Sequence, residues 1–278
     1  MIRIITDSTS DLTDRAAELG IDVLPLTVHF GEETYRDGVD LTNAAFYEKL
    51  ASCEVLPKTA QINPEGFQDL FRRYVEAGDD IIGIFIASEL SGTCQSAHIA
   101  RAAVSEEHIF LIDSRSATSG AILLVLEALK LRAAGKSASE IYKAVTALSQ
   151  RLRLFICTST LKYLKMGGRI SPEAAEQGTL MGISPIISIK EGVVSAAGKA
   201  RGQKAAYQWM IEQMSVYPPD PQYSFVFCNS DNAAGMMQFR QAVGEQYDVS
   251  SAQCNELGAV VGTHVGPGAV GVAYIEAL

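Results

Sequence analysis

The stretch IIGIFIASELSGTCQSA, residues 81–97, joins a run of apolar residues to a polar turn and the start of a helix. The apolar run predicts a buried strand, and the residues after the turn have the pattern of a helix. Ser91, Gly92 and Thr93 form the turn. Free backbone N–H groups and the positive end of a helix dipole meet at such a turn, so it can hold an anion or a carboxylate. Taken alone, the stretch is better explained as an ordinary turn in which Ser91 caps the helix.

Strand and helix patterns alternate around this stretch throughout the first half of the chain. Short apolar runs at residues 3–6, 23–30, 81–86 and 108–112 are separated by helical patterns. This alternation is typical of an α/β layer with a mostly parallel sheet, in which ligands bind beyond the carboxyl ends of the strands. Asp7, Ser91 and Asp113 each follow a predicted strand, so we expect them near that edge.

The second half of the chain has a different pattern. A strand at 154–158 and a hairpin over 183–196 precede helices at 205–216 and 233–247, with further strands at 224–228 and 251–256. These elements predict an α+β domain with a mixed sheet. We therefore predict an α/β protein of two domains, residues 1–152 and 153–278, with a ligand between them. No linker rich in Pro, Gly or Ser separates the two, so they should be tightly apposed.

The composition limits the classes of function. Of the 278 residues, 47% are hydrophobic and 20% are charged, which suits a packed core. The net charge of −9 argues against nucleic-acid binding and allows at most transient membrane contact. No apolar run approaches the roughly 20 residues that span a bilayer, and the first residues lack the pattern of a signal peptide. Five scattered cysteines and four histidines predict a cytoplasmic protein with free thiols and no metal site.

Three further stretches bring polar side chains and turn residues together. Thr59 lies in a predicted loop, Arg169 follows Gly167 and Gly168 at a predicted helix end, and His264 lies in a glycine-rich loop. Each has an ordinary explanation, as a solvated hydroxyl, an exposed arginine or a structural histidine. Each could also belong to a site, because glycines allow close backbone approach and a backbone nest with a cation suits a phosphate or carboxylate.

Two enzymatic alternatives remain open at this point. Ser91, His264 and an acid such as Asp7 supply the residue types of a hydrolase triad. Asp7 and Asp113 could instead bind Mg²⁺ for phosphoryl transfer, although carboxylates that cap the following helices explain them more simply. The sequence contains no P-loop, dinucleotide-binding, zinc-protease or nucleophile-elbow motif.

A basic group precedes one of the predicted helices in the second half. It consists of Lys199, Arg201 and Lys204. On an acidic chain such a group could dock an acidic partner. Its ordinary explanation is a solvated surface charge.

Taken together and in order, these stretches resemble the DegV family. That family comprises bacterial fatty-acid-binding proteins that act as lipid-carrying subunits of fatty acid kinase. The resemblance covers nearly the whole chain and rests on ITDSTSDL, PLTVHFGEETYRDGVDLT, PKTAQINPEGF, ELSGTCQSA, FLIDSRSATSG, LKYLKMGGRIS, GISPIISIKEGVV and GTHVGPGAVGVAY. Two departures stand out. Residues 60–64 differ from the Ser-Gln-Pro-Ser-Pro that is common in the family, and Cys94 replaces a common aromatic residue.

The resemblance implies a long-chain fatty acid bound in a buried tunnel between the two domains. It implies that Thr59 and Ser91 hydrogen-bond the carboxyl group, with Gly92, Thr93, His264 and Arg169 around it. An ATP-dependent kinase subunit would phosphorylate that carboxyl group and would face the basic group Lys199, Arg201 and Lys204. The chain itself would then be a substrate presenter, not an enzyme, and would need no cofactor.

Overall fold

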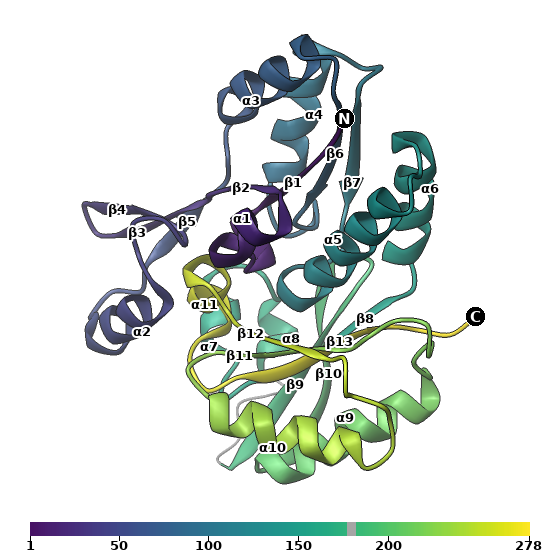
Figure 1. Ribbon diagram of the computed structural model, residues 1–278. Coiled ribbons are helices and arrows are strands. Elements are labelled where there is room, and N and C mark those ends of the chain that lie inside the picture. The colour runs from purple at the N-terminus through teal and green to yellow at the C-terminus, as the bar shows by residue number, and fades with distance from the viewer. Residues whose placement is uncertain (177–181) are drawn as a thin grey trace.

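The computed structural model describes residues 1–176 and 182–278. The first half of the chain is built around a parallel four-stranded sheet (Figure 1). Its order is β2-β1-β6-β7, formed by β1 (Ile2–Asp7), β2 (Asp22–Leu24), β6 (Asp80–Phe85) and β7 (Ile109–Asp113). Helices α3 (Pro64–Glu76) and α4 (Thr93–Val104) lie on one side of it, and α5 (Thr118–Ala133) and α6 (Ala138–Ser149) on the other. The predicted α/β layer is confirmed.

A six-stranded mixed sheet forms the second lobe. Its order is β10-β9-β8-β13-β11-β12, and all neighbours are antiparallel except β11 and β12. The strands are β8 (Leu152–Cys157), β9 (Ile183–Lys190), β10 (Val193–Arg201), β11 (Val226–Asn229), β12 (Gln253–Glu256) and β13 (Val270–Ile275). Helices α9 (Gln203–Val216) and α10 (Ala233–Gly244) cover its outer face (Figure 1). The predicted mixed sheet is confirmed.

A small antiparallel sheet forms an arm beside the first lobe. It has the order β4-β3-β5 and carries α2, with β3 (Thr27–Phe30), β4 (Glu33–Arg36), β5 (Lys58–Ala60) and α2 (Asn43–Ser52). The single strand predicted over 23–30 is therefore wrong. Pro25 separates β2 from β3, because proline has no N–H group to donate to a sheet. The loop predicted around Thr59 is also wrong, since Thr59 pairs with Val28 inside the arm.

Helix α5 connects the cores of the two lobes. Residues 118–125 of this helix are all buried, and both Leu124 and Val125 are fully buried. One continuous apolar cluster extends from Ile82 in the parallel sheet through this helix to Ile156 and Ile187 in the mixed sheet. A domain boundary at 152/153, where β8 begins, stays a proposal because the core itself is not interrupted there.

Several short elements complete the chain. They are 3-10 turns at Ser8–Ser10 and Thr13–Arg15, and helices α1 (Ala16–Leu19), α7 (Lys162–Met166), α8 (Pro172–Glu176) and α11 (Ala259–Val265). Helices α7 and α11 lie between the lobes (Figure 1). The glycine-rich loop predicted around His264 is wrong, because His264 lies in the last turn of α11. Gly262 lies within that helix, and its lack of a side chain leaves room for Phe46. A Cβ there would lie 2.6 Å from Phe46 Cε1.

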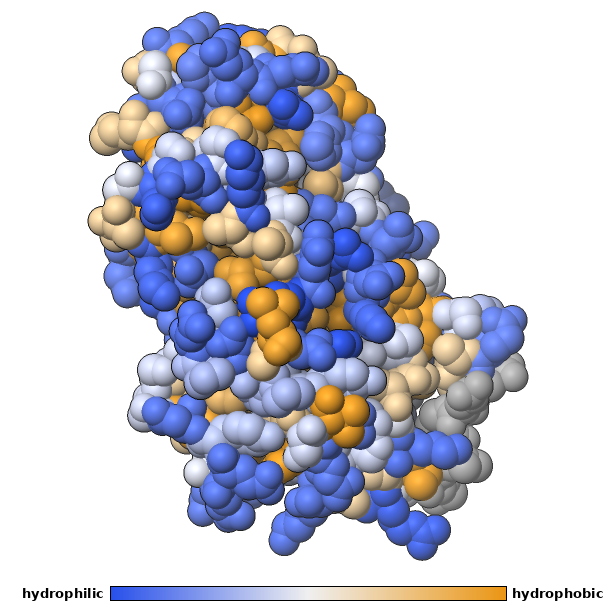
Figure 2. Space-filling model, turned by 90° about the vertical axis from the view of Figure 1, so that its right-hand side faces the viewer, coloured by the Kyte–Doolittle hydropathy of each residue, from blue (hydrophilic) through white to orange (hydrophobic). Residues whose placement is uncertain are grey.

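The surface is mostly polar on the face shown in Figure 2. Hydrophobic side chains reach that surface in small groups along the waist between the lobes. Within the described ranges, no helix combines the length and apolar character that crossing a bilayer requires. All five cysteines are free thiols, as predicted.

Candidate ligand-binding site

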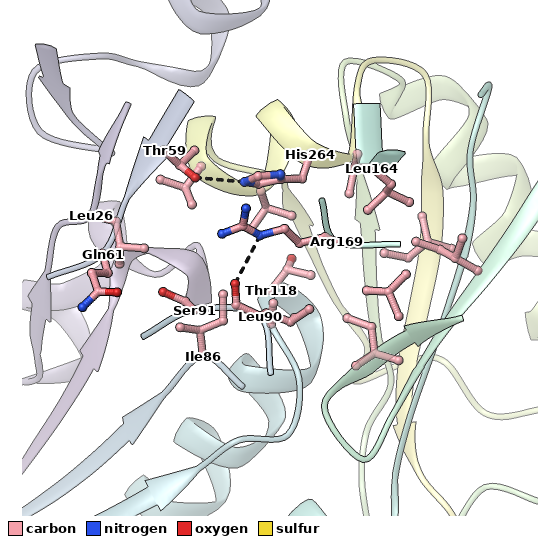
Figure 3. A pocket seen from close by; sticks show the side chains of 18 of the residues that line it. Leu26, Thr59, Gln61, Ile86, Leu90, Ser91, Thr118, Leu164, Arg169 and His264 are labelled. Carbon is pink, nitrogen blue, oxygen red and sulfur yellow. Dashed lines mark hydrogen bonds between the residues drawn. The ribbon is translucent and has the colours of Figure 1, made fainter. Parts of the chain in front are cut away.

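A cavity of about 350 Å³ lies between the arm, the first lobe and the second lobe. Strand β5, the turn before α4, the first turn of α5, strands β8 to β10 and helices α7 and α11 all contribute to its wall. Toward the mixed sheet the wall is made of branched aliphatic side chains, Ile156, Ile187, Ile189 and Val194. Polar side chains gather at the other end, where Thr59, Ser91, Arg169 and His264 lie close together (Figure 3). The cavity is therefore apolar along its length and polar at one end.

Thr59 and His264 meet at the polar end. The Thr59 Oγ1 atom lies 2.9 Å from His264 Nε2. Strand β5 presents Thr59 from the arm, and the last turn of α11 presents His264 from the second lobe. The other ring nitrogen, Nδ1, is buried and has no hydrogen-bond partner among the described residues. It lies against Gly167, where a Cβ would come within 2.2 Å of it. Position 167 therefore has to be glycine for the ring to sit where it does.

The imidazole of His264 is neutral at neutral pH. Burial, together with the nearby charge of Arg169, lowers the pKa of His264 to about 4. A neutral ring donates from one nitrogen and accepts at the other. When Nε2 carries the proton and donates it to Thr59, the Thr59 hydroxyl is free to donate its own proton into the cavity. The pair can thus offer a hydrogen bond to an acceptor without adding a charge.

Ser91 lines the cavity from the turn before α4, and Thr93 supports it. Gly92, not Ser91, is the N-cap residue of α4. The Ser91 Oγ atom accepts a hydrogen bond from the Thr93 backbone N–H at 3.3 Å and lies 3.0 Å from Thr93 Oγ1. Thr93 Oγ1 also accepts from the Ile62 N–H at 3.4 Å. Thr93 is fully buried and is not one of the lining residues. Its bonds hold the Ser91 hydroxyl at the cavity wall.

Gly92 lines the cavity next to Gln61, a residue for which the sequence predicted no role. A Cβ at position 92 would lie 2.1 Å from Gln61 Oε1, so the glycine makes room for this side chain. Gln61 Nε2 donates to Ser96 Oγ at 3.0 Å, which fixes the amide at the wall. Its position directly after Lys58, Thr59 and Ala60 was the feature of the sequence that could have indicated a place in the site. Thr118, in the first turn of α5, was missed as well, and it also lines the cavity.

Arg169 places a positive charge at the polar end. The chain turns at Gly168, whose φ of +70° suits glycine, and Arg169 N–H then donates to Leu164 O at 3.0 Å. Its guanidinium donates from Nη1 to Gly167 O at 2.6 Å and from Nε to Leu90 O at 3.3 Å. Among the described residues no carboxylate pairs with it. The remaining N–H groups of this partly buried cation are therefore available to an anionic ligand.

The basic group lies elsewhere on the surface. Lys199 and Arg201 are exposed near the end of edge strand β10, and Lys204 is exposed in the first turn of α9. None of the three lines the cavity. The structure thus separates them from Thr59, Ser91 and Arg169.

The two enzymatic arrangements are not assembled in the described part of the chain. Ser91 Oγ bonds to Thr93, and His264 Nε2 bonds to Thr59, so no Ser91–His264 hydrogen bond is present. The carboxylate of Asp7 accepts backbone N–H groups of Thr9 and Ile86, and burial raises its pKa. Asp113 similarly accepts from Ser88 and the N–H of Arg115. No three His, Cys, Asp or Glu side chains of the described residues are placed to hold a metal ion.

Comparison with known proteins gives a consistent match over the full chain. The family described as "Uncharacterised protein, DegV family" matches residues 1–277. A DegV domain-containing protein of Caldanaerobacter subterraneus is 34% identical over 277 residues, which is 99% of both chains. A solved fatty-acid-binding DegV family protein from Thermus thermophilus is 32% identical, with a TM-score of 0.90 and 99% of both chains covered. The fatty acid kinase B3 protein of Streptococcus pneumoniae, solved with linoleic acid, has a TM-score of 0.87 at 22% identity. The match covers 100% of both chains and shows that they share a fold.

Proposed function

The chain belongs to the DegV family, and we propose that it binds a long-chain fatty acid in the cavity between its lobes. The observation that carries this proposal is the polarity of the cavity, which has hydroxyls and a cation at one end and aliphatic side chains along the rest. An amphiphile with one anionic head and one apolar tail matches that distribution. The fatty-acid-binding relative from Thermus thermophilus supports the choice of ligand.

The head group is held by hydrogen bonds and by one positive charge. The hydroxyls of Thr59 and Ser91 donate to the carboxylate oxygens, and the guanidinium of Arg169 supplies a charge-assisted bond. Neutral His264 orients Thr59 by the 2.9 Å hydrogen bond between Nε2 and Oγ1. Because the head group lies next to a partly buried cation, it binds in its ionised form.

The tail supplies most of the binding free energy. Each methylene group removed from water contributes about 0.8 kcal/mol. The volume of about 350 Å³ falls within the range of small-molecule pockets. Side chains such as Ile187 and Val194 offer the tail no hydrogen-bonding group, so affinity should grow with chain length until the cavity is filled.

We propose further that the chain presents the fatty acid to a kinase subunit. In that step a carboxylate oxygen attacks the γ-phosphorus of ATP held by the partner, forming an acyl phosphate and releasing ADP. The absence of a P-loop from the sequence fits a protein that leaves ATP binding to its partner. The exposed basic group Lys199, Arg201 and Lys204 would face that partner. The fold shared with the fatty acid kinase B3 protein supports this role.

The direct test is the identity of the bound molecule. The purified protein is extracted with organic solvent under denaturing conditions, and the extract is examined by mass spectrometry. We expect a C14 to C18 fatty acid, and uptake of oleate or palmitate by the emptied protein. The double variant Thr59→Ala/Ser91→Ala should bind more weakly by about 1–3 kcal/mol. A protein that is repeatedly empty and takes up neither fatty acid would overturn the proposal, whereas ester hydrolysis abolished by Ser91→Ala would favour a hydrolase.

A further inference from the structure

Helix α11 begins against two carboxyl groups from the first half of the chain. Asp11 Oδ1 accepts the N–H of Gly258 at 2.9 Å, and Asp37 Oδ1 accepts the N–H of Ala259 at 2.9 Å. These are the first free amides of the helix, where a negative charge is favoured. Asp11 follows the turn after β1, and Asp37 follows β4 in the arm. Two separate segments therefore fix the start of one helix.

The two carboxyl groups have no charged partner to offset their burial. No salt bridge in the described ranges reaches Asp11 or Asp37. Asp37 is 2% exposed, and its Oδ2 atom has no hydrogen-bond partner among the described residues. Burial raises the pKa of Asp37 to about 6, and burial together with the charge of Asp37 raises the pKa of Asp11 to about 8. Both carboxyl groups are thus held by backbone amides of α11 and not by a counter-charge.

The same carboxyl groups are connected to the walls of the cavity. Helix α11 contributes Val260, Val261, His264 and Val265 to the lining. The second oxygen of Asp11 accepts hydrogen bonds from the Thr118 hydroxyl and, at 2.9 Å, from Asn255 Nδ2. Thr118 lines the cavity with a φ of +45°, an unfavourable conformation for a β-branched residue that the bond to Asp11 helps to hold. Asp11 therefore joins the start of α5 to the start of α11.

A displacement at the start of α11 would reach the head-group site. His264 is five residues after Ala259 in the same short helix, and its ring has to meet Thr59 on the separate arm. We propose that Asp11 and Asp37 are positioning residues of this site: by holding the first two amides of α11, they place His264 against Thr59 and so set the affinity for the carboxyl head. The inference rests on the proposed function for its binding readout, and its structural readout is independent of it.

The binding test compares a fatty acid with the alcohol of the same chain length. Asp37→Ala removes the acceptor for Ala259, and Asp37→Asn keeps an oxygen there. We expect Asp37→Ala to weaken fatty-acid binding by about tenfold relative to its effect on the alcohol, and Asp37→Asn to restore most of that loss. The matched control is Asp40→Ala, which changes an exposed aspartate three residues further along the same loop. It should leave the affinity for both ligands unchanged. In a protein that already carries His264→Gln, Asp37→Ala should cause little further loss of fatty-acid affinity, because both substitutions act on the contact between His264 and Thr59.

The structural test records the ¹⁵N resonances of the His264 ring by NMR in the ligand-free protein. We expect these resonances to shift in Asp37→Ala and in Asp11→Ala, and to stay unchanged in Asp40→Ala. Asp11→Ala serves as the test variant if Asp37→Ala does not fold. Unchanged ring resonances with unchanged selectivity for acid over alcohol in a folded Asp37→Ala protein would overturn the inference. If the wild-type protein takes up no fatty acid, the proposed function fails, and the ring resonances still decide whether the two aspartates position His264.

Discussion

Thr59 Oγ1 lies 2.9 Å from His264 Nε2, although 205 residues separate the two in the chain. The bond links the arm to helix α11 at the polar end of the cavity. Because the ring is neutral, it orients the Thr59 hydroxyl without competing with Arg169 for the negative charge of a carboxylate. This contact joins residues from separate parts of the chain into one site.

Removing the charge of Arg169 should weaken binding of the fatty acid selectively. In Arg169→Met the aliphatic stem remains while the guanidinium is lost, so we expect the affinity for a fatty acid to fall at least tenfold, about 1.4 kcal/mol, with a smaller change for the matching alcohol. The pKa of His264 should rise, since the charge of Arg169 helps to lower it. Calorimetric titration measures both affinities. Lys162→Met, an exposed lysine of α7, is the control, and an equal loss for acid and alcohol would contradict the assigned role.

The ionisation of His264 should make the protein less stable in acid. Its pKa is about 4 in the folded protein, below the ordinary value near 6.5. Between these values the unfolded chain binds a proton that the folded chain does not, so the free energy of unfolding falls as the pH is lowered from about 6.5 to about 4. The slope should be shallower in His264→Gln. Denaturant unfolding at several pH values measures this difference, in which the titrations of Asp11 and Asp37, present in both proteins, cancel.

Two adjacent glycines should respond differently to alanine. Gly167→Ala places a Cβ 2.2 Å from His264 Nδ1, so the ring has to move and fatty-acid affinity should fall by about tenfold or more. Gly168→Ala meets no atom within 4 Å but strains a φ of +70°, so it should cost about 1 kcal/mol of stability and leave affinity nearly unchanged. Binding and denaturant titrations of both variants measure the two effects. Equal affinities for the two variants would show that the ring tolerates the added carbon.

Reversing the charge of the basic group should separate binding from presentation. The variant Lys199→Glu/Arg201→Glu/Lys204→Glu changes exposed side chains outside the cavity, so fatty-acid affinity should stay at the wild-type value. Acyl phosphate formation with the kinase subunit should slow by at least tenfold at physiological salt, because charged groups at an interface govern the rate of association. Lys136→Glu, an exposed lysine beyond the end of α5, is the control. Full activity of the triple variant would place the docking surface elsewhere.

The local elements of the fold followed from the sequence because their causes are local. The capping box of α6, in which Ser137 and Glu140 exchange hydrogen bonds, is such an element, because it depends only on two residue types three positions apart. The parallel sheet of the first lobe was predicted from alternating periodicities. Its site-bearing turn at Ser91 was found in the same way. The strand predicted over 23–30 is wrong because one proline redirects the chain into a second sheet. Helix α11 was missed because closely spaced glycines favour a loop, whereas Gly262 lies inside the helix and packs against Phe46.

The tertiary structure decided which of these residues act together. The sequence alone determined where strands and helices alternate and which stretches carry hydroxyls, a cation and a histidine beside glycines. It could not show that Gly167 makes room for the ring of His264, or that Gln61 fills the space beside Gly92. Nor could it show that Asp11 and Asp37 hold the helix that carries His264. Such contacts join residues far apart in the chain, and they exist only once packing of the two lobes and the arm has brought those residues within van der Waals distance.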